Sequence, residues 1–373
     1  MRHVRDDEVY IRRVGEPFSG PVPVASTDAS APSDASPRTR RRPAKPAAPA
    51  PTPPPSAPRR YSGVILLVTI LVVAAAVGAT AWWAMAQSTD HVFAGRALYV
   101  DRDSSAAVAA ETTRSAAERE AAELIAAQPT GIWLTPERNP AGEVASTVRS
   151  IVIASKSAMP VFVVYGITDR DCGGQSAGGL PPDDYLEWVD EIADAIGHTQ
   201  AIVVLEPDAL ALAPECGDAA GRAELVGEAL ARLESSGAIV YLDGGHSNWL
   251  PVDEMAELLS AAGVDRARGF ATNVSNTQTT DAESAYATEL SAALGGAHAV
   301  IDTSRNGNGP PADAEWCNAP GRALGEVPTI VEDPVVDALL WIKPPGESDG
   351  RCNGGPAAGE WWPERAIELA GTG

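Results

Sequence analysis

Lysine, cysteine and histidine are scarce in this chain of 373 residues. There are three lysines, four cysteines and five histidines, and no two cysteines have the C-x₂₋₄-C spacing of common zinc sites. Positive charge is also short outside the N-terminus: residues 1–60 carry 11 Lys and Arg against 6 Asp and Glu, whereas 61–373 carry 17 against 44. Such an acidic body argues against nucleic acid as a partner and suits a neutral substrate.

The few cysteines are unevenly placed. Cys172, Cys216, Cys317 and Cys352 all lie after the uncharged segment 63–86, and no cysteine lies before it. An even number of cysteines is typical of exported proteins with disulfides, here two bonds with three possible pairings. A zinc site is the alternative, but the spacing does not favour it. We therefore expect no metal and no cofactor.

The N-terminal part predicts a membrane anchor. Residues 17–60 are rich in Pro, Ala, Ser and Arg, so 1–60 is predicted to be a disordered cytoplasmic tail. Residues 63–86 have no charge, and a helix of that length would span about 36 Å. The sequence thus predicts a transmembrane signal-anchor helix at 61–86 and an extracellular domain at 87–373. Cleavage after Ala86, which would release a secreted protein, is the alternative.

After this segment, short apolar runs alternate with helical patterns. Strands are expected at 96–100, 131–135, 159–167, 200–207, 238–245, 267–274, 297–304 and 338–345. Helices are expected at 105–128, 143–157, 183–196, 218–235, 251–262 and 281–294. This alternation is typical of a parallel sheet with crossover helices. We expect an α/β fold, a distorted parallel β/α barrel of seven or eight strands, with an open doubly wound sheet as the alternative.

Polar, acid-rich segments follow nearly every predicted strand. The stretch "VVLEPDALALAPEC" at 203–216 runs from a buried strand directly into Glu206 and Asp208. An acidic helix cap would explain one such segment. Six of them at the carboxyl ends of parallel strands, where active sites of this fold class lie, instead indicate a catalytic rim.

These segments resemble glycoside hydrolase family 6, the inverting β-1,4-glucanases that include endoglucanases and cellobiohydrolases. The matching stretches include "VVYGITDRDCGGQSAGG" (163–179), "VVLEPDALALAPEC" (203–216), "YLDGGHSNWL" (241–250) and "LLWIKPPGESDGRCNGG" (339–355). The resemblance covers about 91–370. It implies inverting hydrolysis of β-1,4-glucosidic bonds in a β-glucan by a monomer without a cofactor.

The resemblance also implies catalytic roles. Inversion needs a protonated carboxyl on the leaving oxygen and a carboxylate that activates water. Asp208 matches the general acid, and Asp171 matches the aspartate that raises the pKa of that acid, with an ion pair to Arg170 as the alternative. Asp349 matches the position usually proposed for the base, although it could instead be a structural partner of Lys343 or Arg305. Asp243 matches an electrostatic or positioning residue. Tyr165 matches the tyrosine that presses the reacting sugar out of its relaxed chair.

Further positions match substrate-binding residues of the family. The aromatic stacking residues are Trp133, Trp249 and Trp316, and the hydroxyl-binding residues are His246, Asn273, Lys343 and Glu347. The family pattern also suggests the disulfides Cys172–Cys216 and Cys317–Cys352. Thr168 and Thr277 depart from the pattern, but neither departure removes a catalytic group.

Short spacing between the motifs favours endo action. Asp349 lies only 24 positions after Gly325, which leaves little chain for the long loops that enclose the cleft of exo-acting members. Two other hypotheses stay open at this stage. One is a catalytically inactive protein that binds glucan or cell wall, and the other is the same hydrolysis on a different β-glucan.

Overall fold

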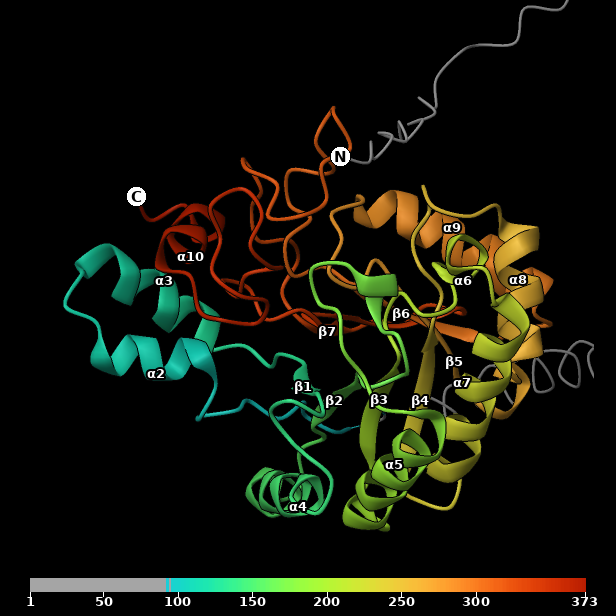
Figure 1. Ribbon diagram of the computed structural model, residues 1–373. Coiled ribbons are helices and arrows are strands. Elements are labelled where there is room, and N and C mark those ends of the chain that lie inside the picture. Colours follow the sequence, from blue (N-terminus) through green and yellow to red (C-terminus); the bar gives the residue numbers. More distant parts are fainter. Residues whose placement is uncertain (1–91, 94) are drawn as a thin grey trace, which may run out of the picture. The chain divides into compact units, whose positions relative to one another are not determined.

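The computed structural model describes residues 92, 93 and 95–373 of the protein (Figure 1). The predicted tail at 1–60 and the predicted span at 61–86 lie outside these residues. Within the described part, no helix combines the length and the apolar character that a membrane crossing requires.

Eight strands form one sheet. They are β1 Ile132–Leu134, β2 Val161–Val164, β3 Ala201–Leu205, β4 Ala238–Asp243, β5 Gly269–Thr272, β6 His298–Asp302, β7 Thr329–Ile330 and β8 Val336–Leu340. Their order is β1-β2-β3-β4-β5-β6-β8-β7, with every neighbouring pair parallel except β7 and β8. Seven of the eight predicted strands are therefore confirmed as parallel strands of this sheet.

Helices surround the sheet in the described part of the chain. They are α2 Ser105–Thr112, α3 Ala116–Ala126, α4 Val144–Ser155, α5 Pro182–Ile196, α6 Ala213–Cys216, α7 Ala219–Leu233, α8 Val252–Ala261, α9 Thr280–Ala293 and α10 Pro363–Ala370, with 3₁₀ turns at Asp171–Gly173 and Val264–Arg266. In Figure 1, α4, α5, α7, α8 and α9 follow the curve of the sheet, whereas α2, α3 and α10 lie together at one side.

The sheet curls into a half-barrel rather than a regular closed barrel. Beyond the ladder that joins β6 to β8, the contact between β8 and β1 is a single bridge at Thr130 and Trp341. The Gly131 amide donates to the Trp341 carbonyl at 2.8 Å. A Cβ at Gly131 would lie 2.2 Å from the Ile342 carbonyl oxygen, so this approach requires glycine. The α/β class with a mostly parallel eight-stranded sheet is confirmed, and the predicted distorted barrel has this partly closed, half-barrel form.

Apolar side chains fill both faces of the sheet. Val163, Ile202 and Val204 belong to an inner core that also contains Tyr241. Their neighbours along the strands, among them Val203, pack outward against the helices. Strands that are buried on both faces explain the continuous Val, Ile and Leu runs of the sequence. Each fully buried side chain of this size stabilises the fold by about 1.5–3 kcal/mol.

Five elements differ from the sequence-based prediction. The predicted helix 105–128 is two helices, because the hydroxyl of Ser115 accepts a bond from the Glu118 amide at 3.3 Å and caps a new helix. The predicted strand 96–100 makes only an isolated bridge between Leu98 and Met159. The short elements α6, α10 and β7 were not predicted.

Candidate active site

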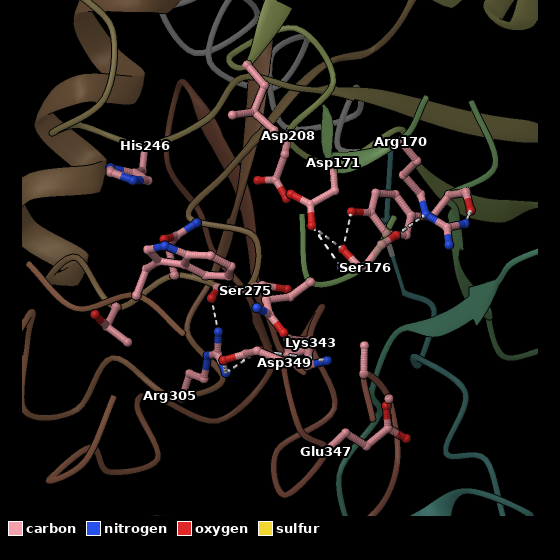
Figure 2. A pocket seen from close by; sticks show the side chains of 18 of the residues that line it. Arg170, Asp171, Ser176, Asp208, His246, Ser275, Arg305, Lys343, Glu347 and Asp349 are labelled. Carbon is pink, nitrogen blue, oxygen red and sulfur yellow. Dashed lines mark hydrogen bonds and ion pairs between the residues drawn. The ribbon is translucent and has the colours of Figure 1, made fainter. Parts of the chain in front are cut away.

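A cleft of about 810 Å³ lies at the carboxyl ends of the strands (Figure 2). Ten of the predicted site residues line it: Trp133, Tyr165, Asp171, Asp208, His246, Trp249, Trp316, Lys343, Glu347 and Asp349. Trp133 lies in β1, and the others come from segments that follow β2, β3, β4, β6 and β8. The parallel sheet therefore brings together residues that lie more than 200 positions apart, as strand ends of this fold class do.

Asp208 is held by its backbone on a sharply bent segment after β3. Glu206 and Asp208 both have positive φ, 50° and 67°, which ordinary side chains rarely adopt. The Asp208 amide donates to Asp243 Oδ2 at 2.9 Å, and the Gly245 amide donates to the same oxygen at 3.1 Å. Asp243 is almost fully buried and does not line the cleft, so it fixes the position of Asp208 from behind.

The pKa of Asp208 is raised to about 7, first by burial and then by the negative charges of Asp171 and Asp349, while Arg305 acts in the opposite direction. A carboxyl with this pKa holds its proton in mildly acidic solution. Buried Asp243 also has a raised pKa, through burial and the neighbouring Asp208. Asp208 therefore has the protonation state that a general acid needs.

Asp171 belongs to a hydrogen-bonded group with Ser176 and Tyr165. Asp171 Oδ2 accepts bonds from the Ser176 amide at 2.8 Å and from the Ser176 hydroxyl at 3.0 Å. Ser176 Oγ lies 2.9 Å from Tyr165 Oη. The ion pair of Arg170 is made with Glu137 Oε1 at 3.2 Å, and its guanidinium lies 4.6 Å from the centre of the Tyr165 ring. The alternative in which Arg170 neutralises Asp171 is thus wrong.

Asp349 is held by a buried ion pair. Arg305 Nη1 donates to both carboxylate oxygens at 2.8 Å, and the Asn318 amide donates to Oδ2 at 2.8 Å. Lys343 Nζ lies 4.0 Å from Oδ1. Burial alone would raise the pKa of Asp349, but the charges of Arg305 and Lys343 outweigh it and lower the pKa. A carboxylate held this way is a poor proton acceptor, so the geometry favours the structural-partner alternative over the role of base.

Trp133, Lys343 and Glu347 line one end of the cleft. The indole Nε1 of Trp133 donates to the Ile342 carbonyl at 2.9 Å, which fixes the ring, and Lys343 Nζ lies 5.4 Å from the ring centre. The Trp133 ring also meets the Tyr165 ring edge-on at 5.2 Å. A fixed indole beside charged hydrogen-bonding groups suits a sugar ring with its equatorial hydroxyls.

His246, Trp249 and Trp316 provide further lining. The rings of His246 and Trp249 lie 5.2 Å apart, and burial lowers the pKa of His246 to about 4, so its imidazole is neutral near pH 7. Trp316 is 54% exposed. Asn273 differs from the prediction, because it is fully buried and does not line the cleft. Its amide bonds to main-chain groups of Gln278 and Asp302, so it shapes a turn.

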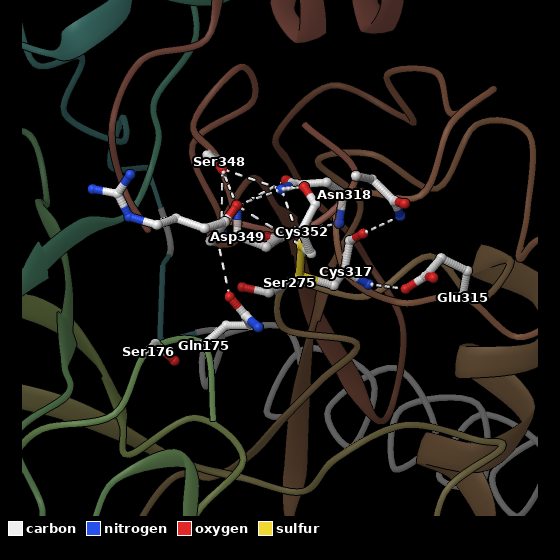
Figure 3. Close-up of a disulfide and its surroundings, with 12 residues drawn as sticks. Gln175, Ser176, Ser275, Glu315, Cys317, Asn318, Ser348, Asp349 and Cys352 are labelled. Carbon is white, nitrogen blue, oxygen red and sulfur yellow. Dashed lines mark hydrogen bonds between the residues drawn. A yellow bond between two sulfur atoms is a disulfide. The ribbon is translucent and has the colours of Figure 1, made fainter. Parts of the chain in front are cut away.

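Two disulfides connect the segments that carry the aspartates, as the family pattern implied. Cys172–Cys216 ties the segment of Asp171 to α6, and Cys317–Cys352 ties two segments beside Asp349 (Figure 3). Figure 3 also shows Gln175, whose Oε1 accepts a bond from the Arg351 amide at 3.1 Å. Within 92–93 and 95–373, no group of three or more His, Cys, Asp or Glu side chains could hold a metal ion.

Sequence reasoning missed the contributions of Ser176, Asn318 and Gln175. Ser176 and Gln175 lie in the Gly-rich loop that follows Asp171, and their polarity between glycines was the available signal. Asn318 bonds to Asp349 through both its amide and its side-chain oxygen, and no local pattern indicated this.

A cleft that combines fixed aromatic side chains with the raised pKa of Asp208 and the lowered pKa of Asp349 has the groups that a glycoside hydrolase uses. Residues 93–372 match the family model described as "Glycosyl hydrolases family 6". The chain belongs to this family.

Named relatives agree with this assignment. Endoglucanase A of Cellulomonas fimi is 48% identical over 66% of this chain, and the chain spans 55% of the length of that relative. Endoglucanase A of Thermobispora bispora is 43% identical over 84% of this chain and 69% of its own length. The structure of endoglucanase Cel6 from Mycobacterium tuberculosis, in complex with a methyl-cellobiosyl-thio-cellobioside, matches with 44% identity and a TM-score of 0.71. That match covers 76% of this chain and 99% of the other.

Proposed function

We propose that the protein hydrolyses β-1,4-glucosidic bonds of a cellulose-like β-glucan with inversion, and that Asp208 is the general acid. The observation that carries this proposal is the raised pKa of Asp208, a cleft-lining carboxyl whose position is fixed by Asp243. A protonated carboxyl at this place can donate to the leaving glycosidic oxygen as the bond breaks. The indole of Trp133 and the polar groups around it would hold the sugar in register.

We assign activation of the attacking water to Asp171. Asp349 is engaged by Arg305, whereas Asp171 is partly exposed and lines the cleft beside Ser176. We propose that the proton of the attacking water reaches Asp171, directly or through a second water held by Ser176. Its negative charge also raises the pKa of Asp208, so one carboxylate supports both the acid and the positive transition state.

Endo action is the proposed mode of attack. Most of the chain between Asp171 and Asp208 forms α5 and β3, and most of the chain between Gly325 and Asp349 forms β7, β8 and their connection. Little chain is left to build a roof over the cleft. The three endoglucanases named above support this mode.

The proposed function is tested by incubating the protein with carboxymethylcellulose and measuring both the viscosity and the number of new reducing ends. We expect a rapid loss of viscosity at few new reducing ends, because an open cleft binds the middle of a polymer. Slow loss of viscosity with cellobiose as the first product would contradict endo action. Retained binding to cellulose without any new reducing ends would favour the inactive glucan-binding protein. Activity confined to another soluble β-glucan would favour that substrate.

We also propose that the catalytic domain is exported and held at the membrane by the segment 61–86. The two disulfides support export, because such bonds are rare in reducing compartments. The uncharged run and the Lys and Arg residues before it support an anchor with the N-terminus inside. Protease added to intact cells should digest the catalytic domain and leave the tail protected. Protection of the whole chain would contradict this orientation, and full-length protein in the medium would contradict the anchor.

A further inference from the structure

A second hollow of about 420 Å³ lies between α2 and α3, apart from the main cleft. One face of α2, made of Ser105, Val108, Ala109 and Thr112, forms one wall, as the i, i+3, i+4, i+7 spacing allows. Glu118 of α3 and Trp361 contribute to the rest of the lining. These helices lie together with α10 at one side of the sheet (Figure 1).

The groups in this hollow are of the kinds that line the main cleft. The indole Nε1 of Trp361 donates to Glu118 Oε1 at 3.2 Å, and the Thr113 hydroxyl donates to the other oxygen of the same carboxylate. An aromatic ring, a carboxylate and threonine hydroxyls suit a ligand that has flat apolar faces and many hydroxyls. None of the described residues that line the hollow is cationic, so a phosphate or another anion does not fit it.

The hollow shares a wall with the cleft. Glu347, which lines the cleft, pairs in an antiparallel bridge with Trp361, which lines the hollow. The Trp362 amide donates to the Gly346 carbonyl at 2.8 Å and holds these two segments together. The Ser105 hydroxyl, on the side of the hollow, donates to Glu347 Oε1 at 2.8 Å. The two spaces thus lie on either side of the contacts that Glu347 makes with Ser105 and Trp361.

We propose that a β-glucan chain bound in the cleft continues past Glu347 into this hollow, which forms a distal subsite for the same chain. The proposal rests on the proposed function of the cleft. Attack within a polymer requires the chain to leave the cleft at both ends, and Glu347 of the cleft contacts Ser105 and Trp361 of the hollow. A volume of about 420 Å³ is within the range of small-molecule sites, roughly 300–1,000 Å³.

Substitution of an exposed helix residue tests the subsite without touching the catalytic groups. Thr112→Arg places a long, charged side chain at the hollow. We expect kcat/KM for cellohexaose to fall about 5- to 10-fold, the effect of losing one stacked ring, while kcat/KM for cellotetraose changes by less than about twofold. The readout is kcat/KM of the purified full chain on both oligosaccharides.

Thr288→Arg is the matched control. Thr288 is an exposed residue of α9, and its hydroxyl donates to the carbonyl four residues earlier at 2.8 Å, as the Thr112 hydroxyl does at 2.7 Å. The control should leave kcat/KM for both oligosaccharides unchanged and should have the Tm of the Thr112→Arg protein.

Equal effects of Thr112→Arg on kcat/KM for the two lengths of oligosaccharide would overturn the subsite. Weaker adsorption to insoluble cellulose with unchanged cellohexaose kinetics would overturn it too, because it would indicate a separate bound chain. Absence of activity on both oligosaccharides in the unmodified protein would instead refute the proposed function.

Discussion

Replacement of Asp208 by asparagine is expected to lower kcat on polymeric β-glucan by about 10²–10⁴-fold, the usual contribution of a general acid. Asparagine keeps the size of the side chain but has no proton to give to the leaving oxygen. The loss should be much smaller on an aryl cellobioside with a good leaving group, since that group needs little protonation. Steady-state kinetics on both substrates measure the difference.

The pH profile provides an independent check of this assignment. The pKa of Asp208 is raised to about 7, so the carboxyl is protonated below that pH, and activity should be lost as the pH rises through it. Asp208→Asn should lack this alkaline limb. Asp194→Asn, at an exposed position of α5, is the control and should keep both rate and profile. Equal losses on polymer and aryl cellobioside would remove Asp208 from the acid role.

Arg305→Met is expected to lower the free energy of unfolding by about 3–5 kcal/mol, because it leaves the Asp349 carboxylate buried without its main partner. The side chains of Arg305 and Asp349 are 7% and 5% exposed, so water cannot replace the lost bonds. Urea unfolding at pH 7 with intact disulfides measures the change. The double variant Arg305→Met, Asp349→Asn should recover most of the loss, since the amide that replaces the unpaired carboxylate carries no charge.

The buried ion pair of Arg305 and Asp349 should contribute more to stability than ion pairs at the surface, because it is shielded from solvent. Arg232 and Asp190 lie 2.7 Å apart with side chains 45% and 44% exposed, and Arg232→Met should cost less than about 1 kcal/mol. The pKa of Asp349 is lowered in the folded state, so the stability it contributes is present above its unfolded pKa of about 3.9 and is lost as the pH falls through the folded value. The difference in free energy of unfolding between wild type and Arg305→Met should therefore become smaller toward pH 3. A gap that does not depend on pH would contradict the charge-based explanation.

The places of the parallel strands along the chain, and the acidic segments that follow them, could be predicted from sequence because each rests on a local pattern. Asp208 and Asp171 directly follow buried apolar runs, and parallel strands bring their carboxyl ends together. The state of Asp349 could not be predicted in this way, since its partner Arg305 is 44 residues away and the choice between base and ion pair depends on side-chain geometry.

Asn273 and the helices α2 and α3 show a second limit of prediction from sequence. Asn273 looks like a polar strand end, yet its positive φ of 63° places its amide within a turn, where it bonds to main-chain groups. The break between α2 and α3 depends on the cap at Ser115, a weak signal inside an Ala- and Glu-rich stretch that favours continuous helix. Local propensity and tertiary geometry compete at such positions, and the sequence displays only the first.

The hydrogen bond between Gln175 and Arg351 has a consequence for how a polymer is held. It joins the loop of Asp171 to the loop of Asp349, and each loop is anchored by its own disulfide. A single bond of this kind contributes about 0.5–1.5 kcal/mol, so thermal motion opens it readily while the disulfides keep both loops in place. We expect this weak bond to open when a polymer chain enters from the side and to form again afterwards. The closed bond then slows the departure of the chain, so that one encounter with a polymer yields several neighbouring cuts.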